Sequence, residues 1–257
     1  MINILCVYVK CDEFELRMDC LWSLSNFSNC DCQAILRHMM EMGLLPILFK
    51  ISCVNNPALL ELPLRIIGNL LTGDDIMIDQ LISYGVIPVI AKHLRSDYIQ
   101  LRREATWALS NIASGTKSQI NALIESGCLQ VVFDLVKDTN IDVVRESIWV
   151  CSNCLSGSDI ELCIKLVKIG IMDPIIYTIA NHLEPSILVI ALEGLKSMFI
   201  QGNVIKEISS NIENPFVSNF VNRGADIYLE KLQHHNNNDV YLAVIHILDN
   251  FFKIVDV

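Results

Sequence analysis

The chain has 257 residues, a formal net charge of −10 at pH 7 and a composition that is 52% hydrophobic. An acidic surface repels nucleic-acid phosphates, so the charge argues against direct binding of DNA or RNA. The mean hydropathy is high at +0.43, but no segment approaches the roughly 18 uninterrupted apolar residues of a membrane-spanning helix. Leu, Ile, Val and Ala dominate, which favours helices packed on helices.

The first segment, "MINILCVYVKCDEF" at residues 1–14, is apolar. It has no basic region ahead of the apolar stretch and no small-residue cleavage site, so it is not typical of a signal peptide. We expect a helix that lacks its upstream neighbour and therefore exposes an apolar stacking face. Because solenoids normally carry polar caps, this end predicts self-association or a capping partner.

A glycine and an asparagine each recur along the chain with a period of 42 or 43 residues. The glycines are Gly43, Gly85, Gly127 and Gly170, and the asparagines are Asn26, Asn69, Asn111 and Asn153. A weaker fifth copy covers residues 188–199, and a sixth contains Gly224 after a longer insertion near 202–222. Two markers with one period predict a tandem repeat over 1–257, with an incomplete first unit.

Each unit has the same internal order, which residues 97–137 illustrate. The pattern predicts one helix from about Asp97 to Asn111, a second over 117–126 that ends at Gly127, and a third over 128–137. A glycine at the end of a helix permits the left-handed turn that often terminates it. Three helices in about 42 residues are typical of an α-solenoid, and no strand alternation competes with that reading.

The ten cysteines are scattered through apolar helical segments, which is typical of reduced, buried thiols. Cys151 and Cys154 form a C-x-x-C pair, but no second pair or nearby histidine pair completes a zinc site, and both lie inside an expected helix. No Gly-rich phosphate loop and no nucleophile with a histidine partner is present. We therefore expect no catalytic residues, no metal and no cofactor.

The segment "REATWALSNIASG" at residues 103–115 shows what one face of the repeated helix carries. At 100° per residue, Glu104, Trp107 and Asn111 fall in a stripe about 60° wide, beside the apolar stripe. The apolar stripe itself consists of Ala105, Ala108, Leu109 and Ile112. The polar stripe is not needed for the core, so it predicts a binding function.

The same three residue types recur at the same positions in successive repeats. The tryptophan position holds Trp22, Arg65, Trp107 and Trp149, the asparagine position holds Asn26, Asn69, Asn111 and Asn153, and the acids Asp19, Glu104 and Glu146 precede the tryptophans by three residues. Successive stacked helices lie about 10 Å apart, so the stripe predicts a ladder along one surface.

The chemistry of this ladder suits an extended peptide rich in Lys and Arg. An indole face attracts a cation and covers its methylene stem, at roughly 0.5–2 kcal/mol each. An asparagine amide can both donate to and accept from a peptide backbone, and carboxylates at the rim bind Lys or Arg termini. The alternative interpretation is structural: the indoles pack between helices and the asparagines bridge neighbouring repeats.

Three segments resemble the importin-α (karyopherin-α) family of armadillo-repeat adaptors, which bind nuclear localisation signals. They are "LRIIGNLLTGDD" (64–75), "REATWALSNIASGTKSQINALIESG" (103–127) and "VYLAVIHILDNFF" (240–252). The resemblance runs through nearly the whole chain and is to the C-terminal half of the family. It implies an all-α, right-handed armadillo solenoid of about six repeats.

The resemblance also implies roles for individual residues. Arg65, Asn69, Trp107, Asn111, Trp149 and Asn153 correspond to the family's minor signal-binding site, Ser110 and Glu146 to positions lining a pocket there, Thr72 and Asp75 to the surroundings of another pocket, and Trp22 and Asn26 to the linker region between sites. The implied partners are cargo proteins with basic localisation signals, and the export receptor at the C-terminal repeats. The implied location is both cytoplasm and nucleus.

Several residues and segments depart from the family pattern and limit which of its binding sites we expect in this chain. No basic segment precedes the repeats, so binding of importin-β through this chain is not expected, and the repeats of the major signal site are missing. Ile78 stands where the family has a small polar residue, and Ser197 stands where an asparagine is expected, so the ladder is predicted to end near there. The alternative function is a general armadillo scaffold with no preference for basic peptides.

Overall fold

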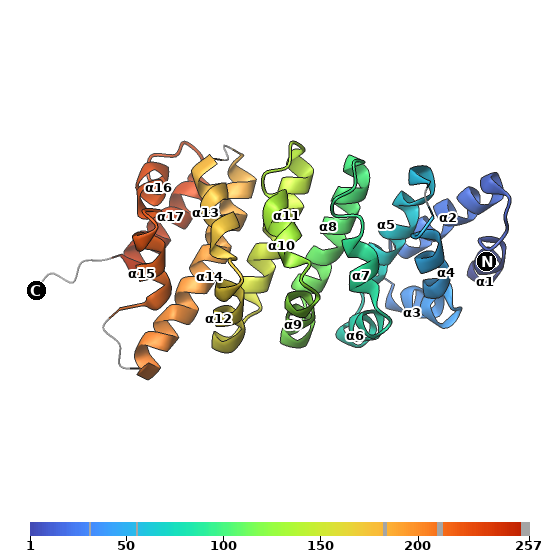
Figure 1. Cartoon of the computed structure of the whole chain (residues 1–257), viewed down its shortest axis with the longest axis horizontal. Coiled ribbons are helices and arrows are strands. Elements are labelled where there is room, and N and C mark those ends of the chain that lie inside the picture. The colour runs from blue at the N-terminus through green and yellow to red at the C-terminus, as the bar shows by residue number, and fades with distance from the viewer. Residues whose placement is uncertain (31, 55, 182–183, 210–212, 253–257) are drawn as a thin grey trace, which may run out of the picture. The chain divides into compact units, whose positions relative to one another are not determined.

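The computed structural model describes residues 1–30, 32–54, 56–181, 184–209 and 213–252. Within these ranges the chain forms 17 α-helices and one short 3₁₀ helix, with no strand (Figure 1). The predicted all-α fold class is therefore confirmed. The chain divides into two compact units, Met1–Val131 and Val132–Val257.

The first unit contains the helices that precede the boundary, which itself falls inside α10. They are α1 (Ile2–Tyr8), α2 (Phe14–Ser28), α3 (Gln33–Glu41), α4 (Leu44–Ile51), the 3₁₀ helix η1 (Pro57–Leu59), α5 (Glu61–Leu70), α6 (Asp75–Ser83), α7 (Val86–Ala91), α8 (Ile99–Ala113), α9 (Lys117–Ser126) and α10 (Leu129–Leu135). From α2 onward, two short helices alternate with a longer one, as the sequence period predicts; between α4 and α6 the place of the longer helix is taken by η1 together with α5.

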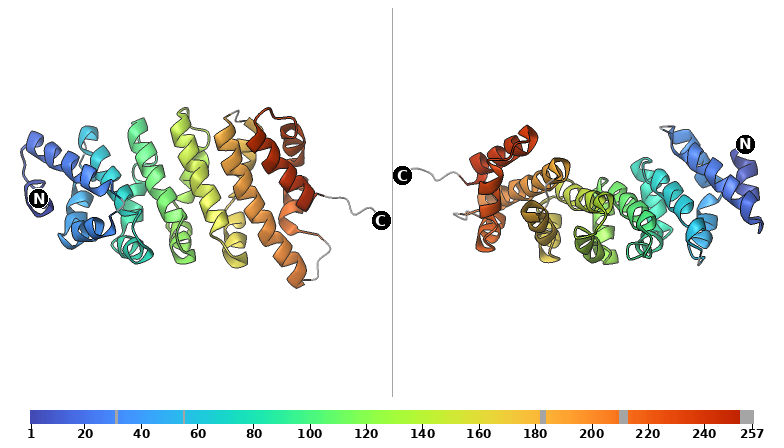
Figure 2. Two further views of the ribbon diagram at one scale, coloured as in Figure 1. Left: turned by 180° about the vertical axis from the view of Figure 1, so that it is seen from behind. Right: turned by 90° about the horizontal axis from the view of Figure 1, so that it is seen from above.

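The second unit continues the same alternation. Its helices are α11 (Ile141–Ser156), α12 (Ile160–Lys168), α13 (Met172–Asn181), α14 (Pro185–Ser209), α15 (Pro215–Asn222), α16 (Asp226–Leu232) and α17 (Asn238–Phe251). Here α11, α14 and α17 are the longer helices, and α14 packs against both of the others (Figure 2).

The helix boundaries expected around residues 97–137 agree with the structure to within two residues. The helix α9 spans Lys117–Ser126 and is closed by Gly127, which has a φ of 71°. A side chain with a Cβ is strained in this left-handed conformation, so glycine allows the chain to turn sharply into the next helix. At the other end of α9, Thr116 and Gln119 form a reciprocal capping box.

The core is built from the apolar stripes of the longer helices together with buried residues of the short helices, such as Leu48 of α4 and Leu123 of α9. In α8 the four residues predicted for this stripe, Ala105, Ala108, Leu109 and Ile112, are completely buried. Burial of a Leu or Ile side chain contributes about 1.5–3 kcal/mol, and each stripe is covered by the neighbouring helices of the stack. The apolar faces are thus buried between successive repeats.

The insertion expected near residues 202–222 is mostly helical. The helix α14 continues to Ser209, well past the point at which α11 ends, and α15 begins at Pro215; residues 210–212 lie outside the described ranges. Gly202 lies inside α14 and leaves room for the side chain of Asn214, because a Cβ at this position would lie 2.0 Å from the Asn214 Oδ1. Asn214 in turn caps α15.

Among the described helices, α14 is long and apolar enough by length and composition to cross a membrane. Of its most apolar window, 56% is buried inside the protein. The core helix of a soluble protein has the same properties, and α14 packs against α11, α13 and α17.

The paired cysteines of α11 are both completely buried. Burial raises the pKa of the Cys151 thiol, and it raises the pKa of Cys163 to about 11. In the part of the chain that the structure describes, no group of three or more His, Cys, Asp or Glu side chains is placed to hold a metal ion.

His93, which follows α7, is 93% buried, and its Nε2 atom has no hydrogen-bond partner among the described residues. Burial lowers the pKa of His93, against an opposing hydrogen bond with the backbone of Ser52. An imidazole with a lowered folded pKa binds fewer protons folded than unfolded, so stability falls as pH drops below the unfolded pKa of about 6.5.

We therefore expect His93→Gln to flatten the pH dependence of stability below neutral pH. The measurement is urea unfolding of both proteins at several pH values between neutrality and the onset of acid unfolding. His234→Gln, which replaces an exposed histidine, serves as the control and should retain the wild-type slope. If the free energy of unfolding fell equally steeply with pH in all three proteins, His93 would not be the source of the pH dependence.

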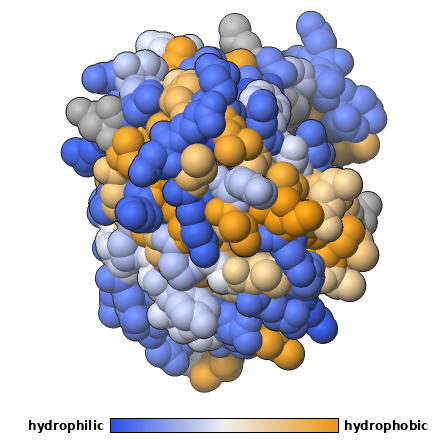
Figure 3. Space-filling model, turned by 90° about the vertical axis from the view of Figure 1, so that its right-hand side faces the viewer, coloured by the Kyte–Doolittle hydropathy of each residue, from blue (hydrophilic) through white to orange (hydrophobic). Residues whose placement is uncertain are grey.

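The end of the first unit that carries α1 exposes several apolar side chains. Ile4, Val7 and Tyr8 of α1 are 60%, 62% and 51% exposed, and Figure 3 shows hydrophobic residues gathered on this face. An exposed apolar patch is often an interaction site. The predicted self-association at this end remains a prediction.

If this face pairs two copies of the chain, the mass measured by analytical ultracentrifugation should rise with protein concentration, and Val7→Glu should abolish the rise by placing a charge in the contact. Ile227→Glu, on α16 of the second unit, is the matched control because Ile227 is also exposed. A monomer mass at every concentration would contradict self-association.

Candidate peptide-binding surface

In the first unit, the predicted ladder residues lie on three longer helices that pack in series. The helix α5 contacts both α2 and α8. The three helices carry the i, i+4 pairs Trp22/Asn26, Arg65/Asn69 and Trp107/Asn111. The structure thus brings these pairs onto neighbouring helices within one compact unit.

The indole of Trp107 lies directly against the backbone of Gly68 on α5. A Cβ built on Gly68 would be 2.2 Å from Trp107 Cζ3 and 2.6 Å from Cε3, so only glycine leaves room for the ring. Trp107 is half-buried. Gly68 is not among the residues predicted from the sequence, although its place directly before Asn69, where the other repeats have serine, marks it as unusual.

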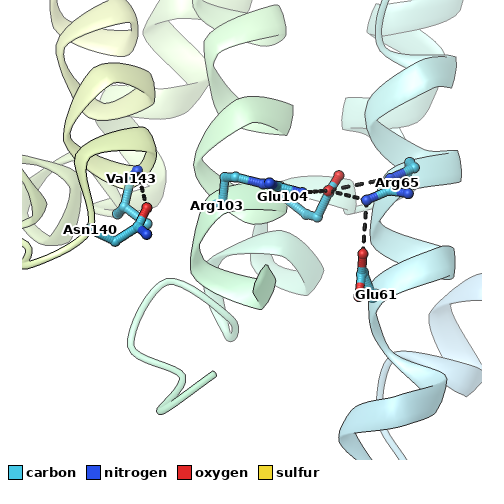
Figure 4. A network of polar contacts seen from close by, with 6 residues as sticks. All are labelled: Glu61, Arg65, Arg103, Glu104, Asn140 and Val143. Carbon is cyan, nitrogen blue, oxygen red and sulfur yellow. Dashed lines mark hydrogen bonds and ion pairs between the residues drawn. The ribbon is translucent and has the colours of Figure 1, made fainter. Parts of the chain in front are cut away.

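Arg65 occupies the tryptophan position of α5 and is held by two carboxylates. Its Nη2 donates to Glu104 Oε1 at 2.7 Å and to Glu61 Oε1 at 2.8 Å. Arg103 donates to the same Glu104 oxygen at 2.9 Å, so this carboxylate lies between two guanidinium groups (Figure 4). The hydrogen bond with Glu104 raises the pKa of Arg65, against the opposing effect of burial.

This network changes what Glu104 can do. Glu104 was predicted to lie at the rim of a pocket for a ligand's Lys or Arg, but only 5% of the residue is exposed and its carboxylate already pairs with Arg65 and Arg103. Two arginines and two glutamates give this cluster no net charge. Glu104 therefore fixes Arg65 in place, and attraction for a cation must come from other groups.

Two of the predicted asparagines bridge neighbouring helices. Asn69 Nδ2 donates to Ser28 Oγ on α2 at 2.8 Å, and Asn111 Nδ2 donates to the carbonyl oxygen of Gly68 on α5 at 3.0 Å. These two hydrogen bonds agree with the alternative interpretation of the sequence, in which the asparagines bridge neighbouring repeats. Each uses one of the two N–H groups of the amide, and Asn111 is still partly exposed.

The other indoles are open to solvent. Trp22 is 51% exposed on α2, beside exposed Asn26 and Asp19. In the second unit Trp149 is 41% exposed on α11, with Glu146 and Asn153 partly exposed on the same helix. Exposed indoles contribute little to the core, so these positions are available to a ligand.

The remaining predicted site residues lie near helix ends or in the core. Ser110 is 6% exposed and donates from Oγ to the carbonyl oxygen of Trp107 at 2.8 Å. Thr72 is exposed, and its Oγ1 donates to the carbonyl oxygen of Asn69. Asp75 is exposed in the first turn of α6. Ser110 thus supports the backbone of α8, and the other two stay accessible.

Comparison with known proteins identifies the repeat. Residues 74–114 match the family model described as the Armadillo/beta-catenin-like repeat. This segment is an armadillo repeat. The matched segment begins at Asp74, which caps α6, and runs through α8, so it covers one unit of two short helices and one longer helix.

The armadillo repeats of this chain resemble those of importin α, as predicted. The chain is 35% identical over 240 residues to importin subunit alpha-3 of Arabidopsis thaliana, and 32% identical over 239 residues to importin subunit alpha-1b of Oryza sativa subsp. japonica. Each alignment covers 93% of this chain, but only 45% and 44% of the relatives. The chain therefore spans less than half the length of the curated relatives it matches.

Solved structures confirm the armadillo fold. A designed armadillo-repeat protein in complex with the peptide (KR)4 matches with a TM-score of 0.84 and 25% identity, covering 96% of this chain and 98% of the designed one. Designed armadillo-repeat proteins made for modular peptide recognition match with a TM-score of 0.84 at 22% identity, covering 98% of this chain and all of theirs.

We expect Gly68→Ala to destabilise the first unit, because the added methyl collides with the Trp107 ring. Overpacking costs about 1–3 kcal/mol, and the better helix propensity of alanine offsets up to about 1 kcal/mol of it. Urea unfolding of Gly68→Ala, Trp107→Ala and the double variant forms a double-mutant cycle. The loss caused by Gly68→Ala should shrink in the Trp107→Ala background, whereas additive losses would contradict the contact.

Proposed function

We propose that this chain binds extended peptides rich in Lys and Arg, such as nuclear localisation signals, and serves as an import adaptor of the importin-α type. The observation that carries this proposal is the pair of exposed indoles, Trp22 and Trp149, at equivalent positions of their helices with an asparagine four residues later. An exposed indole has the flat face that a cation and its methylene stem require.

Two comparisons support the same ligand class. The curated relatives are named importin subunits alpha. The designed protein with the same fold holds a peptide of alternating Lys and Arg, and it is 25% identical to this chain. The net charge of −10 adds a general attraction for such peptides.

The ladder is not uniform, and this shapes the proposed binding mode. In the first unit the middle position is filled by Arg65, whose charge is already neutralised by Glu61 and Glu104. A basic side chain gains nothing from that position, so we place binding in the first unit at the indoles on either side of it, Trp107 and Trp22, and binding in the second unit at Trp149. Trp22 offers a separate position, with Asp19 as its nearby acid.

The cellular role follows from the same proposal. The partners would be cargo proteins with basic localisation signals, and the protein would occur in both cytoplasm and nucleus. A contact of the C-terminal repeats with the export receptor is part of this proposal. The alternative, a general armadillo scaffold, predicts no preference for basic peptides, so one titration separates the two functions.

The test is a fluorescence-anisotropy titration of the purified chain with labelled (KR)4, at about 0.05 M and about 0.5 M salt. The affinity should fall as salt screens the charges. Trp107→Ala and Trp149→Ala should each weaken binding about two- to thirtyfold, because each removes one cation–π contact. Both variants should keep the wild-type helical circular dichroism spectrum.

Two controls make the titration specific. Tyr84→Ala removes an aromatic residue that is 66% exposed beyond the end of α6, away from the longer helices, and should bind as the wild type does. An acidic peptide of equal length should not bind. Equal affinity for the acidic and the basic peptide would favour the scaffold and contradict the adaptor.

A further inference from the structure

The ladder positions can be counted from the start of each longer helix. In α8 and α11 the tryptophan and the asparagine follow the N-cap residue by nine and thirteen positions, and the N-caps are Tyr98 and Asn140. The helix α17 begins after the N-cap Asn237. The same count leads to His246 and Asn250, so a planar ring and an amide recur beyond Ser197, where the sequence pattern predicted the ladder to end.

The second unit places these positions on adjacent helices. The helix α14 lies between α11 and α17 and contacts both (Figure 2). A Cβ on Gly194 of α14 would lie 3.1 Å from the Cα of Ser152 on α11, so the two helices approach closely at this level. Ser197 Oγ, at the asparagine position of α14, lies 3.1 Å from Ser156 Oγ of α11. The face that carries Trp149 therefore continues across α14 to α17.

A groove of about 380 Å³ lies between α14 and α17 at these positions. It is lined by Val189, Leu192, Glu193, Lys196, Asp239, Leu242, Ala243 and His246. Leu192 is buried at its base, and Leu242 is 53% exposed. Glu193, which occupies the tryptophan position of α14, and exposed Asp239 supply carboxylates, and Lys196 forms an ion pair with Glu193.

We propose that this groove binds a Lys or Arg side chain of the same basic peptide, beyond the position of Trp149. This inference rests on the proposed function. Leucine side chains suit the methylene stem of a long basic residue, and two carboxylates suit its charged end. The lining contains two carboxylates and one ammonium group, so the incoming cation competes with Lys196 for Glu193.

The distance between α11, which carries Trp149, and α17, which lines the groove, sets the length of peptide required. Neighbouring helices lie about 10 Å apart and an extended peptide advances about 3.3 Å per residue, so α17 is about six residues from α11 along the peptide. A (KR)6 peptide is long enough to cover both Trp149 and the groove, and it is the probe for the test.

The test measures the affinity of labelled (KR)6 for variants of the whole chain by fluorescence anisotropy. Glu193→Gln and Asp239→Asn should each weaken binding about two- to fivefold. Lys196→Gln should strengthen it, because the competing ammonium is removed. A variant that only disturbed the Glu193–Lys196 pair would weaken binding whichever partner was replaced. Opposite signs, together with an unchanged affinity in a carboxylate variant outside the groove, therefore identify a ligand site.

Glu230→Gln is the matched control, since it removes one exposed carboxylate from α16, outside the groove lining. It should leave the affinity unchanged. If Trp149→Ala weakens binding while Glu193→Gln and Asp239→Asn match Glu230→Gln, the groove proposal is overturned and the proposed function stands. If the wild type does not bind (KR)6, or Trp149→Ala has no effect, both proposals fall.

Discussion

Burial of the apolar stripe of each longer helix against its neighbours is the constraint on which the structure depends. No unit of three helices encloses its own apolar side chains, so stability comes from stacking one repeat on the next. In α8 the stripe of Ala105, Ala108, Leu109 and Ile112 is wholly buried by this stacking. The orientation of α8 within the first unit is then fixed, and so is the direction in which its adjacent stripe faces.

The stacking also decides which polar groups stay available. Where two helices approach closely, polar side chains are used to hold them together, as Asn69 is with Ser28 and as Glu104 is with Arg65. At other equivalent positions the side chain stays exposed, as Trp22 and Trp149 do. One row of equivalent positions therefore combines structural residues with proposed binding residues, and a repeated pattern does not guarantee a repeated role.

Arg65 illustrates the consequence for recognition. At this tryptophan position the guanidinium of Arg65 pairs with Glu61 and Glu104. The two carboxylates therefore already hold a cation of the chain itself, at a place where an indole would be open to a cation of the ligand. The neighbouring indole of Trp107 packs against Gly68, which has no side chain and so leaves space for the ring. Binding on this surface is thus expected to be divided between separate positions, and the groove between α14 and α17 adds a further one in the second unit.

The sequence alone determined the all-helical class, the repeat period, the glycine turns such as Gly127 and the apolar stripe, because these depend on local spacing and backbone geometry. The resemblance to importin α was also evident from sequence. Only the tertiary structure decided which stripe residues are used in contacts between helices. The ion pair of Glu104 with Arg65, the packing of Trp107 on Gly68 and the groove at Glu193 each join residues about 40 or more positions apart in the sequence. Contacts between successive repeats depend on how closely the helices approach, and a pattern read within one repeat carries no information about that distance.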